Sequence, residues 1–396
     1  MLAYLSAQVL TRRIGAGINH CGKRLLIQAM LQPKATFGID KFSSIEFRSF
    51  WPMSRLLITG GAGFIGSHTC VVLLEAGHEL VVLDSFANSS PVALDRVTEL
   101  AGRPVELVEG DVRDAALLDQ LFTDATASSQ PIEAVIHFAG LKAVGESVAE
   151  PLRYWDVNLC GSRTLLDAMD AYGCRTLVFS STSTVYGEAE TFPLTETTPT
   201  APIHPYAQTK LAVEQLLTAL RRSGAWRVAS LRYFNPVGAH PSGRIGEDPY
   251  GIPNNLFPFI TQIAAGRLQS LRVFGNDYPT PDGTGIRDYL HVMDLAEAHT
   301  AAVEHLLKAD APSSVTLNLG TGQGLSVLDV VKGFEAATGI TIPYEVVERR
   351  PGDVAKLQAC PKKAEELLGW TAKRSLADMC RDGWAWQSAN PNGYHP

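Results

Sequence analysis

Several features that mark other classes of protein are scarce in this sequence of 396 residues. It has no run of about 20 uncharged apolar residues, so we expect no membrane span. Its formal net charge is −7, whereas nucleic-acid-binding proteins usually present a basic surface, so we expect no nucleic-acid partner. Its six cysteines are scattered without a Cys-x-x-Cys pair, which indicates neither a metal site nor a redox dithiol. A reducing cytoplasm is the expected compartment.

The first 52 residues differ in composition from the rest of the chain. They hold seven Lys or Arg residues but only two acidic ones, Asp40 and Glu46. A basic, acid-poor segment is typical of an organelle-targeting peptide. A start codon assigned too early would also add such a segment, as a disordered extension, and Met53 would then be the true first residue. We favour this second interpretation. Residues 1–52 are therefore left out of the fold argument.

From Met53 onward, short apolar runs alternate with helical patterns. The runs are rich in leucine or β-branched residues and end in glycine, hydroxyl or acidic residues, as expected of strands buried on both faces. They cover residues 55–59, 80–83, 105–108, 134–139, 176–180 and 228–233. Helical patterns follow Gly66 and cover about 152–172, 206–222, 293–307 and 327–338.

This alternation predicts an α/β fold, a Rossmann-type doubly wound parallel sheet whose ligands bind at the carboxyl ends of the strands. We expect the NAD-binding Rossmann domain over residues 53–235. The sequence to about Gly285 is then rich in Gly, Pro and Asn, as are loops that wrap a ligand. Residues 236–396 are expected to form a smaller C-terminal substrate-binding lobe, with some segments interleaving between the two parts.

The segment Thr59-Gly-Gly-Ala-Gly-Phe-Ile-Gly66 joins the first strand to the first helix. From Gly61 it reads Gly-x-Gly-x-x-Gly, whose glycines allow a tight turn and close approach of the backbone to a pyrophosphate. The helix N-terminus then offers unpaired N–H groups to the phosphates. Asp84 ends the second strand, where a carboxylate can accept both adenosine ribose hydroxyls and repel a 2′-phosphate, so we expect NAD rather than NADP. Asp111 fits either contact with the adenine edge or a helix cap.

Tyr206 and Lys210 lie four residues apart on a predicted helix, so both side chains point from one face. They follow Pro205 at the helix start and the hydroxyl cluster 180–184. Tyrosine has a reference pKa of about 10, and lowering it to about 7 requires about 4 kcal/mol of preference for the phenolate. A Lys ammonium and a positive nicotinamide ring would supply this preference. Tyr206 could then remove a proton from a sugar hydroxyl, with Thr182 sharing the proton or holding the sugar oxygen.

From Met53 to its end the chain resembles the UDP-glucose 4-epimerases, a family of extended short-chain dehydrogenases/reductases. The matching segments are residues 60–66, 137–147, 232–241, 251–255, 274–278 and 283–289. The resemblance implies an isomerase of galactose metabolism that interconverts UDP-glucose and UDP-galactose through a transient 4-keto sugar and tightly bound NAD. Family members pair through helices matching about 152–172 and 206–222, which implies a homodimer.

The resemblance also assigns residues. Tyr206 is the catalytic acid/base, Lys210 binds the nicotinamide ribose and tunes Tyr206, and Thr182 acts with them. The expected cofactor-binding residues are Gly60, Gly61, Gly63, Phe64, Ile65, Gly66, Asp84, Asn88, Ser89, Asp111, Val112, Phe138, Ala139, Gly140, Lys142, Asn158, Tyr206, Lys210 and Phe234. The expected substrate-binding residues are Lys142, Thr182, Asn235, Asn254, Asn255, Phe274, Arg287, Arg350, Asp353 and Leu357.

Two positions depart from the family pattern. Thr182 stands where many members have serine, and because the hydroxyl is kept we expect function to be kept. Leu357 stands where some members have a tyrosine that narrows the sugar pocket and others have a smaller residue that admits N-acetyl sugars. We therefore expect that UDP-N-acetylglucosamine is also a candidate substrate.

Two alternative functions share some of these features. A nucleotide-sugar 4,6-dehydratase has the same fold and cofactor but requires Asp-Glu directly after Thr182, where this chain has Ser183-Thr184. A regulator that binds NAD without chemistry would have no use for Tyr206 and Lys210 together with two phosphate-binding arginines. The epimerase interpretation is favoured over both.

Overall fold

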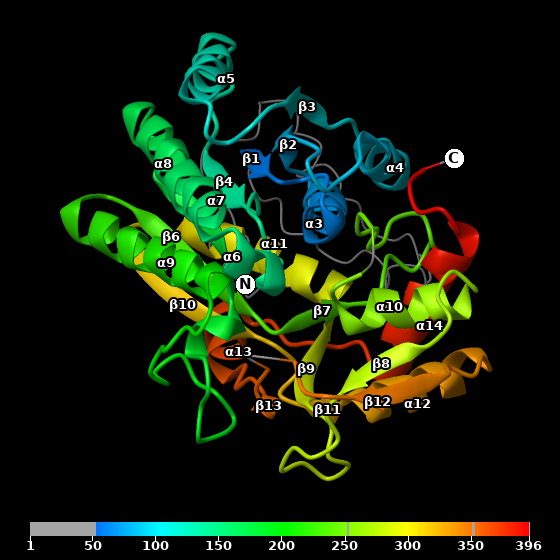
Figure 1. Ribbon diagram of the computed structural model, residues 1–396. Helices are drawn as coiled ribbons and strands as arrows, with labels where there is room; N and C mark the ends of the chain where they lie inside the picture. The colour runs from blue at the N-terminus through cyan, green and yellow to red at the C-terminus, as the bar shows by residue number, and fades with distance from the viewer. Residues whose placement is uncertain (1–52, 252, 351–352, 396) are drawn as a thin grey trace, which may run out of the picture. The chain divides into compact units, whose positions relative to one another are not determined.

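The computed structural model describes residues 53–396 except 252, 351, 352 and 396, so our expectations for residues 1–52 lie outside the described part. A parallel sheet of seven strands, in the order β10-β6-β5-β4-β1-β2-β3, lies at its centre (Figure 1). The strands are β1 (Arg55–Thr59), β2 (Glu79–Asp84), β3 (Glu106–Glu109), β4 (Ala134–His137), β5 (Thr176–Thr182), β6 (Arg227–Tyr233) and β10 (Ser313–Leu319).

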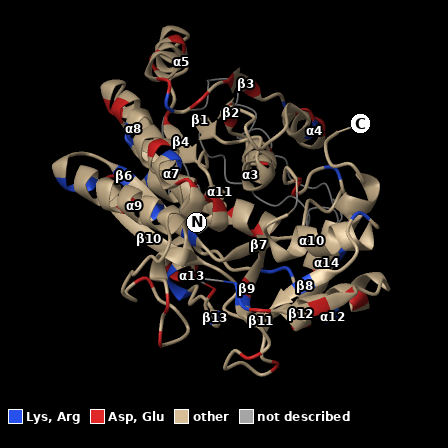
Figure 2. Cartoon of the chain, viewed as in Figure 1, with Lys and Arg blue, Asp and Glu red and all other residues tan. Residues whose placement is uncertain are grey.

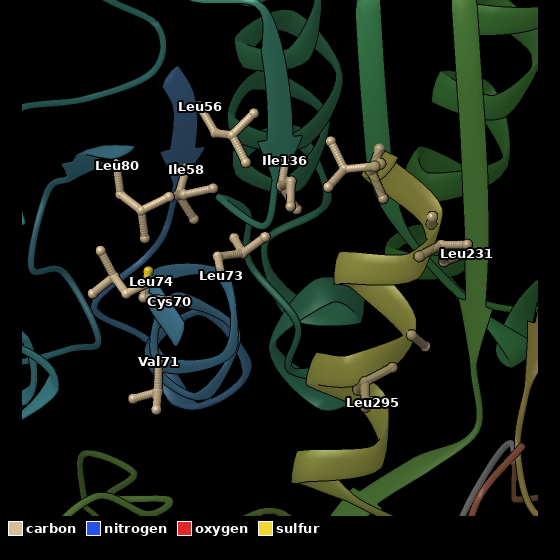
Figure 3. Close-up of a cluster of buried hydrophobic side chains, with 14 of the residues drawn as sticks. Leu56, Ile58, Cys70, Val71, Leu73, Leu74, Leu80, Ile136, Leu231 and Leu295 are labelled. Atoms are coloured by element: carbon tan, nitrogen blue, oxygen red, sulfur yellow. The ribbon is translucent and has the colours of Figure 1, made fainter. Parts of the chain in front are cut away.

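Two sets of helices cover the two faces of this sheet. Along β1, Leu56 and Ile58 belong to one core cluster and Leu57 to the other, because successive strand residues point to opposite faces. On the first face lie α3 (Phe64–Glu75), α4 (Pro91–Ala101) and α11 (Val292–Lys308). Figure 3 shows this cluster, with Leu73 of α3 and Leu295 of α11 among its side chains. On the second face lie α5 (Ala115–Ala127), α8 (Gly161–Ala171) and α9 (Pro205–Ser223). The doubly wound fold that the sequence predicts is confirmed.

One predicted strand is less buried than expected. β3 was expected to be buried on both faces, but three of its four residues are exposed, and Leu107 is 42% exposed. The reason is its place at the edge of the sheet, where it pairs with β2 alone. The sheet also contains a strand that the sequence did not predict: β10, from the C-terminal part of the chain, pairs with β6. Residues 292–319 thus return to the large sheet as α11 and β10.

The helix predicted over residues 152–172 is divided into three pieces. α7 (Pro151–Tyr154) and α8 flank a π-helix, η2 (Trp155–Cys160). A π-turn holds one residue more than an α-turn, which rotates the side chains that follow it and is common at functional sites. Here the π-helix contains Asn158, whose side chain is buried. Two short helices lie next to the site, α6 (Val144–Ala149) and the 3₁₀-helix η3 (Ser183–Tyr186).

A smaller lobe follows the large sheet. Its central strand β9 (Ile286–His291) pairs with β7 (Asn235–Val237), β11 (Gly324–Ser326) and β13 (Lys356–Leu357). β8 (Leu271–Phe274) and β12 (Tyr344–Val347) form a separate parallel pair. The helices of this part are α10 (Leu256–Ala264), α12 (Val327–Thr338) and α14 (Leu376–Ala389), whereas α13 (Lys362–Leu368) packs through Ala364 in the core cluster on the first face of the large sheet. Within the described residues, no helix is long and apolar enough to cross a membrane.

The strand order reverses between β1 and β4, because β2 and β3 follow β1 on one side while β5 and β6 follow β4 on the other. In open α/β sheets, ligands bind at the carboxyl ends of the strands next to such a reversal. The glycine turn, Phe138 and the hydroxyl cluster all follow strands at this edge. The β7–β9 pairing begins two residues after β6 ends, so it brings the smaller lobe to the same edge.

Candidate active site

The glycine turn packs so tightly that two of its glycines leave no room for a side chain. A Cβ on Gly60 would lie 2.7 Å from the Ala139 nitrogen, and Gly60 has a positive φ of 72°. A Cβ on Gly66 would lie 2.4 Å from the Gly60 oxygen. α3 begins at Phe64, so Gly66 lies in its first turn rather than before it, and no side chain among the described residues caps the helix. Its first N–H groups are therefore open to an anion, together with the helix dipole.

Asp84 lies at the end of β2, beside this turn. Its buried carboxylate accepts hydrogen bonds from the Ala62 N–H at 2.9 Å and the Ser89 hydroxyl at 2.8 Å. The bond to Ala62 joins β2 to the glycine turn. Asn88 is exposed and its side-chain oxygen accepts from the Tyr250 N–H at 3.5 Å. Asp84 therefore lies at the end of β2 beside the glycine turn, as expected, and its contact with an adenosine ribose stays a prediction.

Asp111 does not cap a helix, so that alternative is wrong. The cap of α5 is Asp114, whose carboxylate accepts from the Leu117 N–H at 3.0 Å. Asp111 instead pairs with the Arg113 guanidinium at 2.6 Å, and this hydrogen bond is the main cause that lowers the pKa of the Asp111 carboxyl. The adjacent Val112 is buried in the second core cluster, against Gly161. Contact of Asp111 with adenine stays a prediction.

The loop after β4 meets the π-helix and α9 at one point. The Asn158 side chain accepts from the Leu141 N–H at 2.8 Å and donates to the Leu141 carbonyl at 3.1 Å and to the Thr209 hydroxyl at 3.1 Å. A Cβ on Gly140 would lie 3.0 Å from the Asn158 oxygen and 3.6 Å from the Lys210 ammonium nitrogen. Asn158 therefore fixes the loop 138–141 against the helix that carries Lys210. Phe138, at the start of this loop, packs its ring 4.8 Å from that of His299 on α11.

Tyr206 and Lys210 lie in the first two turns of α9, which begins at Pro205 with His204 as its cap. This confirms the predicted helix. Burial raises the pKa of Tyr206 to about 12, and a hydrogen bond with Thr182 opposes the increase. The sequence analysis expected a lowered pKa, which required a positive nicotinamide ring that the protein by itself does not supply. Thr182, at the end of β5, therefore lies near the phenol.

Lys210 is almost completely buried, and burial lowers its pKa to about 8. Its ammonium group donates to the Ser180 carbonyl at 2.8 Å and lies 4.9 Å from the centre of the Phe179 ring. No other hydrogen-bond acceptor contacts this ammonium among the described residues. Since an ammonium has three donors, two of them can serve a ligand.

Sequence analysis missed a buried ion pair that continues the same face of α9. Glu214 follows Lys210 by four residues, and its carboxylate accepts from the Arg232 guanidinium at 3.0 and 2.6 Å and from the Ser181 hydroxyl. Arg232 also donates to the Tyr186 hydroxyl at 2.9 Å. The spacing 206, 210, 214 was the available signal, because positions four apart share a helix face. The pair joins α9 to β5 and β6 just behind Thr182.

The second group of expected residues lies on β9 and in the loops beside it, and Figure 2 shows basic colouring on β9, whose sequence contains one arginine, Arg287. Arg287 forms an ion pair with Asp353 at 3.1 Å, and the Arg350 guanidinium lies 4.4 Å from the centre of the Phe274 ring. Arg350 itself is exposed. Leu357 is the backbone neighbour of Arg287 in the β13–β9 pair. The structure therefore brings these five residues together.

Phe234 and Leu357 belong to one small hydrophobic cluster with Val185, Tyr186, Leu194 and Ala359. Leu357 is 6% exposed, so little of its side chain faces outward. This cluster connects Phe234, which follows β6, with β13, the strand that carries Leu357. Asn235, the next residue after Phe234, is half-buried at the start of β7 and pairs with Tyr289 of β9.

Glu247 is a second residue that sequence analysis missed. Its carboxylate accepts from the Lys142 ammonium at 3.2 Å and from the Asn255 side chain at 3.0 Å. It thereby joins two expected ligand-binding residues that are more than a hundred positions apart in the sequence. Asn254 is exposed beside Asn255. Nothing in the local sequence around Glu247 signals this contact.

Known proteins resemble this chain in sequence and in fold. A sequence profile for the family described as GDP-mannose 4,6 dehydratase matches residues 57–383. A UDP-glucose 4-epimerase of Bacillus subtilis is 56% identical over 340 residues, which cover 86% of this chain and 98% of the relative. The crystal structure of a Bifidobacterium longum UDP-glucose 4-epimerase in complex with NAD+ and UDP has a TM-score of 0.82 at 48% identity, over 86% of this chain and 100% of that chain. A UDP-Glc/GlcNAc 4-epimerase of Campylobacter jejuni has a TM-score of 0.71 at 32% identity, over 85% and 99%.

Proposed function

This chain belongs to the family of UDP-glucose 4-epimerases, within the extended short-chain dehydrogenases/reductases, and we propose that it is an NAD-dependent isomerase that interconverts UDP-glucose and UDP-galactose, a reaction of galactose metabolism. The observation that carries the proposal is that Tyr206 and the buried Lys210 lie one turn apart on α9, with Thr182 at the end of β5 near the phenol. This arrangement supports an acid/base, a hydroxyl and a cation acting together at the carboxyl edge of the sheet. The crystallised Bifidobacterium longum relative holds NAD+ and UDP.

The residues at this edge fit NAD. The close packing at Gly60 and Gly66 leaves backbone, rather than side chains, facing a pyrophosphate, and the uncapped start of α3 supplies N–H donors. Asp84 would accept the adenosine ribose hydroxyls and disfavour a 2′-phosphate. Lys210 has donors left for the nicotinamide ribose. NAD, when bound, supplies a hydride acceptor and donor for carbon 4 of the sugar.

Tyr206 performs the proton transfer in this proposal. It removes the proton from the sugar 4-hydroxyl as the hydride leaves the same carbon, which produces a 4-keto sugar. After the sugar turns within the site, Tyr206 returns the proton to the oxygen and the hydride returns to the opposite face. The Thr182 hydroxyl holds the phenol and the sugar oxygen in reach of each other. When a ligand is bound in the site, the positive charge of the Lys210 ammonium favours the charged phenolate form of Tyr206.

UDP must stay bound while the sugar turns, and the second group of residues suits that task. Arg287 can pair two diphosphate oxygens with its planar guanidinium. Asp353, which holds Arg287 at 3.1 Å, can accept a ribose hydroxyl. The sugar itself meets the small hydrophobic cluster at Leu357 rather than charged groups. Firm contacts to the nucleotide and loose contacts to the sugar are the condition for epimerisation.

The experiment that tests the proposal uses purified protein without added NAD. Incubated with UDP-galactose, it should form UDP-glucose, and the product is identified by NMR. A 4,6-dehydratase would instead form a dehydrated keto sugar, but it needs acidic groups after Thr182. This chain has the buried Ser183 and the half-buried Thr184 there. Recovery of unchanged UDP-galactose would refute the proposal.

Leu357 supports a second candidate substrate, UDP-N-acetylglucosamine. A leucine is shorter than the tyrosine that narrows the sugar pocket in some family members, and the related Campylobacter jejuni enzyme is named for both sugars. We expect slow epimerisation of the N-acetyl sugar, and a further increase in its kcat/KM in Leu357→Ala. No detectable turnover of this sugar by the unmodified protein, under conditions where UDP-galactose reacts, would exclude the candidate.

We further propose a cytoplasmic homodimer that pairs through the helices of about residues 152–172 and 206–222. Exposed apolar residues near the start of this helical region, Val148 and Leu152, support a buried interface there. Light scattering after size-exclusion chromatography measures the mass in solution. A mass near twice the 42.8 kDa of one chain is expected, whereas the mass of one chain would contradict the dimer.

A further inference from the structure

Tyr278 carries a buried hydroxyl that has no hydrogen-bond partner among the described residues. The residue is 6% exposed and lies in the loop between β8 and β9. Buried phenol hydroxyls almost always find a partner, so one without a partner calls for an explanation. The other unpartnered buried side-chain atoms of the described chain belong to His68, His78, Thr176 and Ser313. His78, Thr176 and Ser313 lie where strands begin, away from the carboxyl edge, and His68 lies in α3, where its ring packs against that of Phe64.

The Tyr278 ring is held in place from three directions. The Arg349 guanidinium lies 4.1 Å from the ring centre, and Arg349 is fixed by Asp277 at 2.7 Å. A Cβ on Gly275 would come within 2.9 Å of a ring carbon, so the ring packs against the backbone there. The Tyr278 N–H donates to the Gly283 carbonyl at 2.9 Å. The hydroxyl is therefore a preorganised donor rather than a mobile surface group.

The surroundings of the phenol are those of the nucleotide-binding group. Burial raises the pKa of Tyr278, the Asp353 carboxylate raises it further, and the guanidinium groups of Arg349 and Arg287 oppose the increase. The phenol thus lies within electrostatic range of the Arg287–Asp353 ion pair, and it stays protonated at neutral pH. The loop of Tyr278 begins directly after Phe274, against which Arg350 is stacked.

We propose that Tyr278 is a further substrate-binding residue, whose hydroxyl donates a hydrogen bond to an oxygen of the UDP moiety. The inference rests on the proposed function, because it takes the Arg287–Asp353 pair as the nucleotide site. We assign the hydroxyl to the nucleotide because Tyr278 lies in the loop that follows Phe274, one of the expected nucleotide-side residues. Leu357, which we place beside the sugar, packs instead in the cluster around Phe234. A hydroxyl without a protein partner costs the free protein stability and gains its hydrogen bond when the ligand arrives.

The test compares Tyr278→Phe with the unmodified protein and with Tyr344→Phe, a control on β12 whose ring is 48% exposed. Calorimetric titration with UDP should show a Kd about tenfold higher in Tyr278→Phe, as expected for loss of one hydrogen bond to a polar or charged oxygen. The KM for UDP-galactose should rise by a similar factor while kcat stays the same. Without UDP, the melting temperature of Tyr278→Phe should be equal or higher. Tyr344→Phe should match the unmodified protein in every measurement.

Two results would overturn this inference and leave the proposed function unaffected. One is an unchanged Kd for UDP in Tyr278→Phe while the unmodified protein binds UDP and converts UDP-galactose. The other is a lower melting temperature of Tyr278→Phe without UDP, because that would mean that the hydroxyl has a structural partner. If the unmodified protein neither binds UDP nor converts UDP-galactose, the proposed function fails first and this inference fails with it.

Discussion

Around Tyr206 and Lys210 the polar groups are buried and bonded to the backbone or to each other, whereas around Arg287 and Asp353 they are partly exposed and paired mainly with each other. Lys210 donates to a backbone carbonyl, and Glu214 and Arg232 form a two-bond pair behind it. In the second half of the site, the Arg287 side chain is 15% exposed and that of Asp353 is 35% exposed. Arg350 is exposed altogether.

The difference follows from what each half does in the proposed reaction. Proton transfer requires reacting atoms at a fixed distance, so the groups that carry it are held by rigid elements and by contacts that no ligand replaces. A nucleotide that binds and dissociates requires groups that can replace one partner by another at a low cost in free energy. Partly exposed ion pairs can do this, because each pair contributes little to stability. The following predictions test this comparison, beginning with the largest effect.

Replacing Tyr206 by Phe removes the proposed acid/base and keeps the ring. We expect kcat to fall by about 10³-fold or more, because general acid–base catalysis typically contributes 10²- to 10⁴-fold. The Kd for UDP should stay the same, since Tyr206 is in the other half of the site. Steady-state kinetics and calorimetry measure the two quantities. A kcat within tenfold of the unmodified protein would show that another group transfers the proton.

Replacing Arg232 by Met leaves the Glu214 carboxylate buried without its partner. We expect the free energy of unfolding to fall by about 3–5 kcal/mol, as is typical for a broken buried ion pair. The double variant Glu214→Leu/Arg232→Met should recover most of this loss. Unfolding in urea measures the difference. The matched control is Arg163→Met, which breaks the exposed pair with Asp167 and should cost less than about 1 kcal/mol. Equal losses in both variants would show that burial adds nothing to the effect of breaking the Glu214–Arg232 pair.

Replacing Lys210 by Met should stabilise the NAD-free protein at pH 7 while abolishing activity. Burial lowers the pKa of Lys210 from 10.5 to about 8, so the folded protein bears the full cost of a buried ammonium below that pH, about 3 kcal/mol. As the pH rises from 8 towards 10.5, the folded protein releases the proton first and the cost disappears. The advantage of the variant should therefore shrink over this window. An advantage that grows with pH, or none at pH 7, would contradict the assignment.

Replacing Arg287 by Met should act on nucleotide binding. We expect the KM for UDP-galactose to rise by about 20-fold with little change in kcat, because a charge-assisted contact is lost and the Asp353 carboxylate then repels the diphosphate. The Kd of the unmodified protein for UDP should increase with salt more steeply than that of the variant. Arg163→Met again serves as the control. A fall in kcat at unchanged KM would place Arg287 in the catalytic half instead.

The large sheet and its turn were predictable because they follow from local patterns. Apolar runs with polar ends predict strands, the glycines after Thr59 predict a phosphate turn, and the spacing of Tyr206 and Lys210 predicts a shared helix face. The local pattern did not predict that β3 lies at the edge of the sheet, because its sequence resembles that of any other strand. It also did not predict that β10 pairs with β6, because nothing in the sequence of β10 indicates this pairing. Which strand is central or peripheral depends on all the others, so a single run cannot reveal it.

By itself, the sequence determined the fold class, the glycine turn and the helix that carries Tyr206 and Lys210, because turns, strand ends and helix faces are set by residues close together in the chain. Tertiary structure decided the rest. The π-helix orients the Asn158 side chain, and Glu247 contacts both Lys142 and Asn255. The Glu214–Arg232 pair is buried. The Tyr278 hydroxyl has no partner among the described residues, although it lies near Arg287 and Asp353. These contacts join residues from 8 to 105 positions apart in the sequence. Their energies depend on burial, which exists only once the chain has packed.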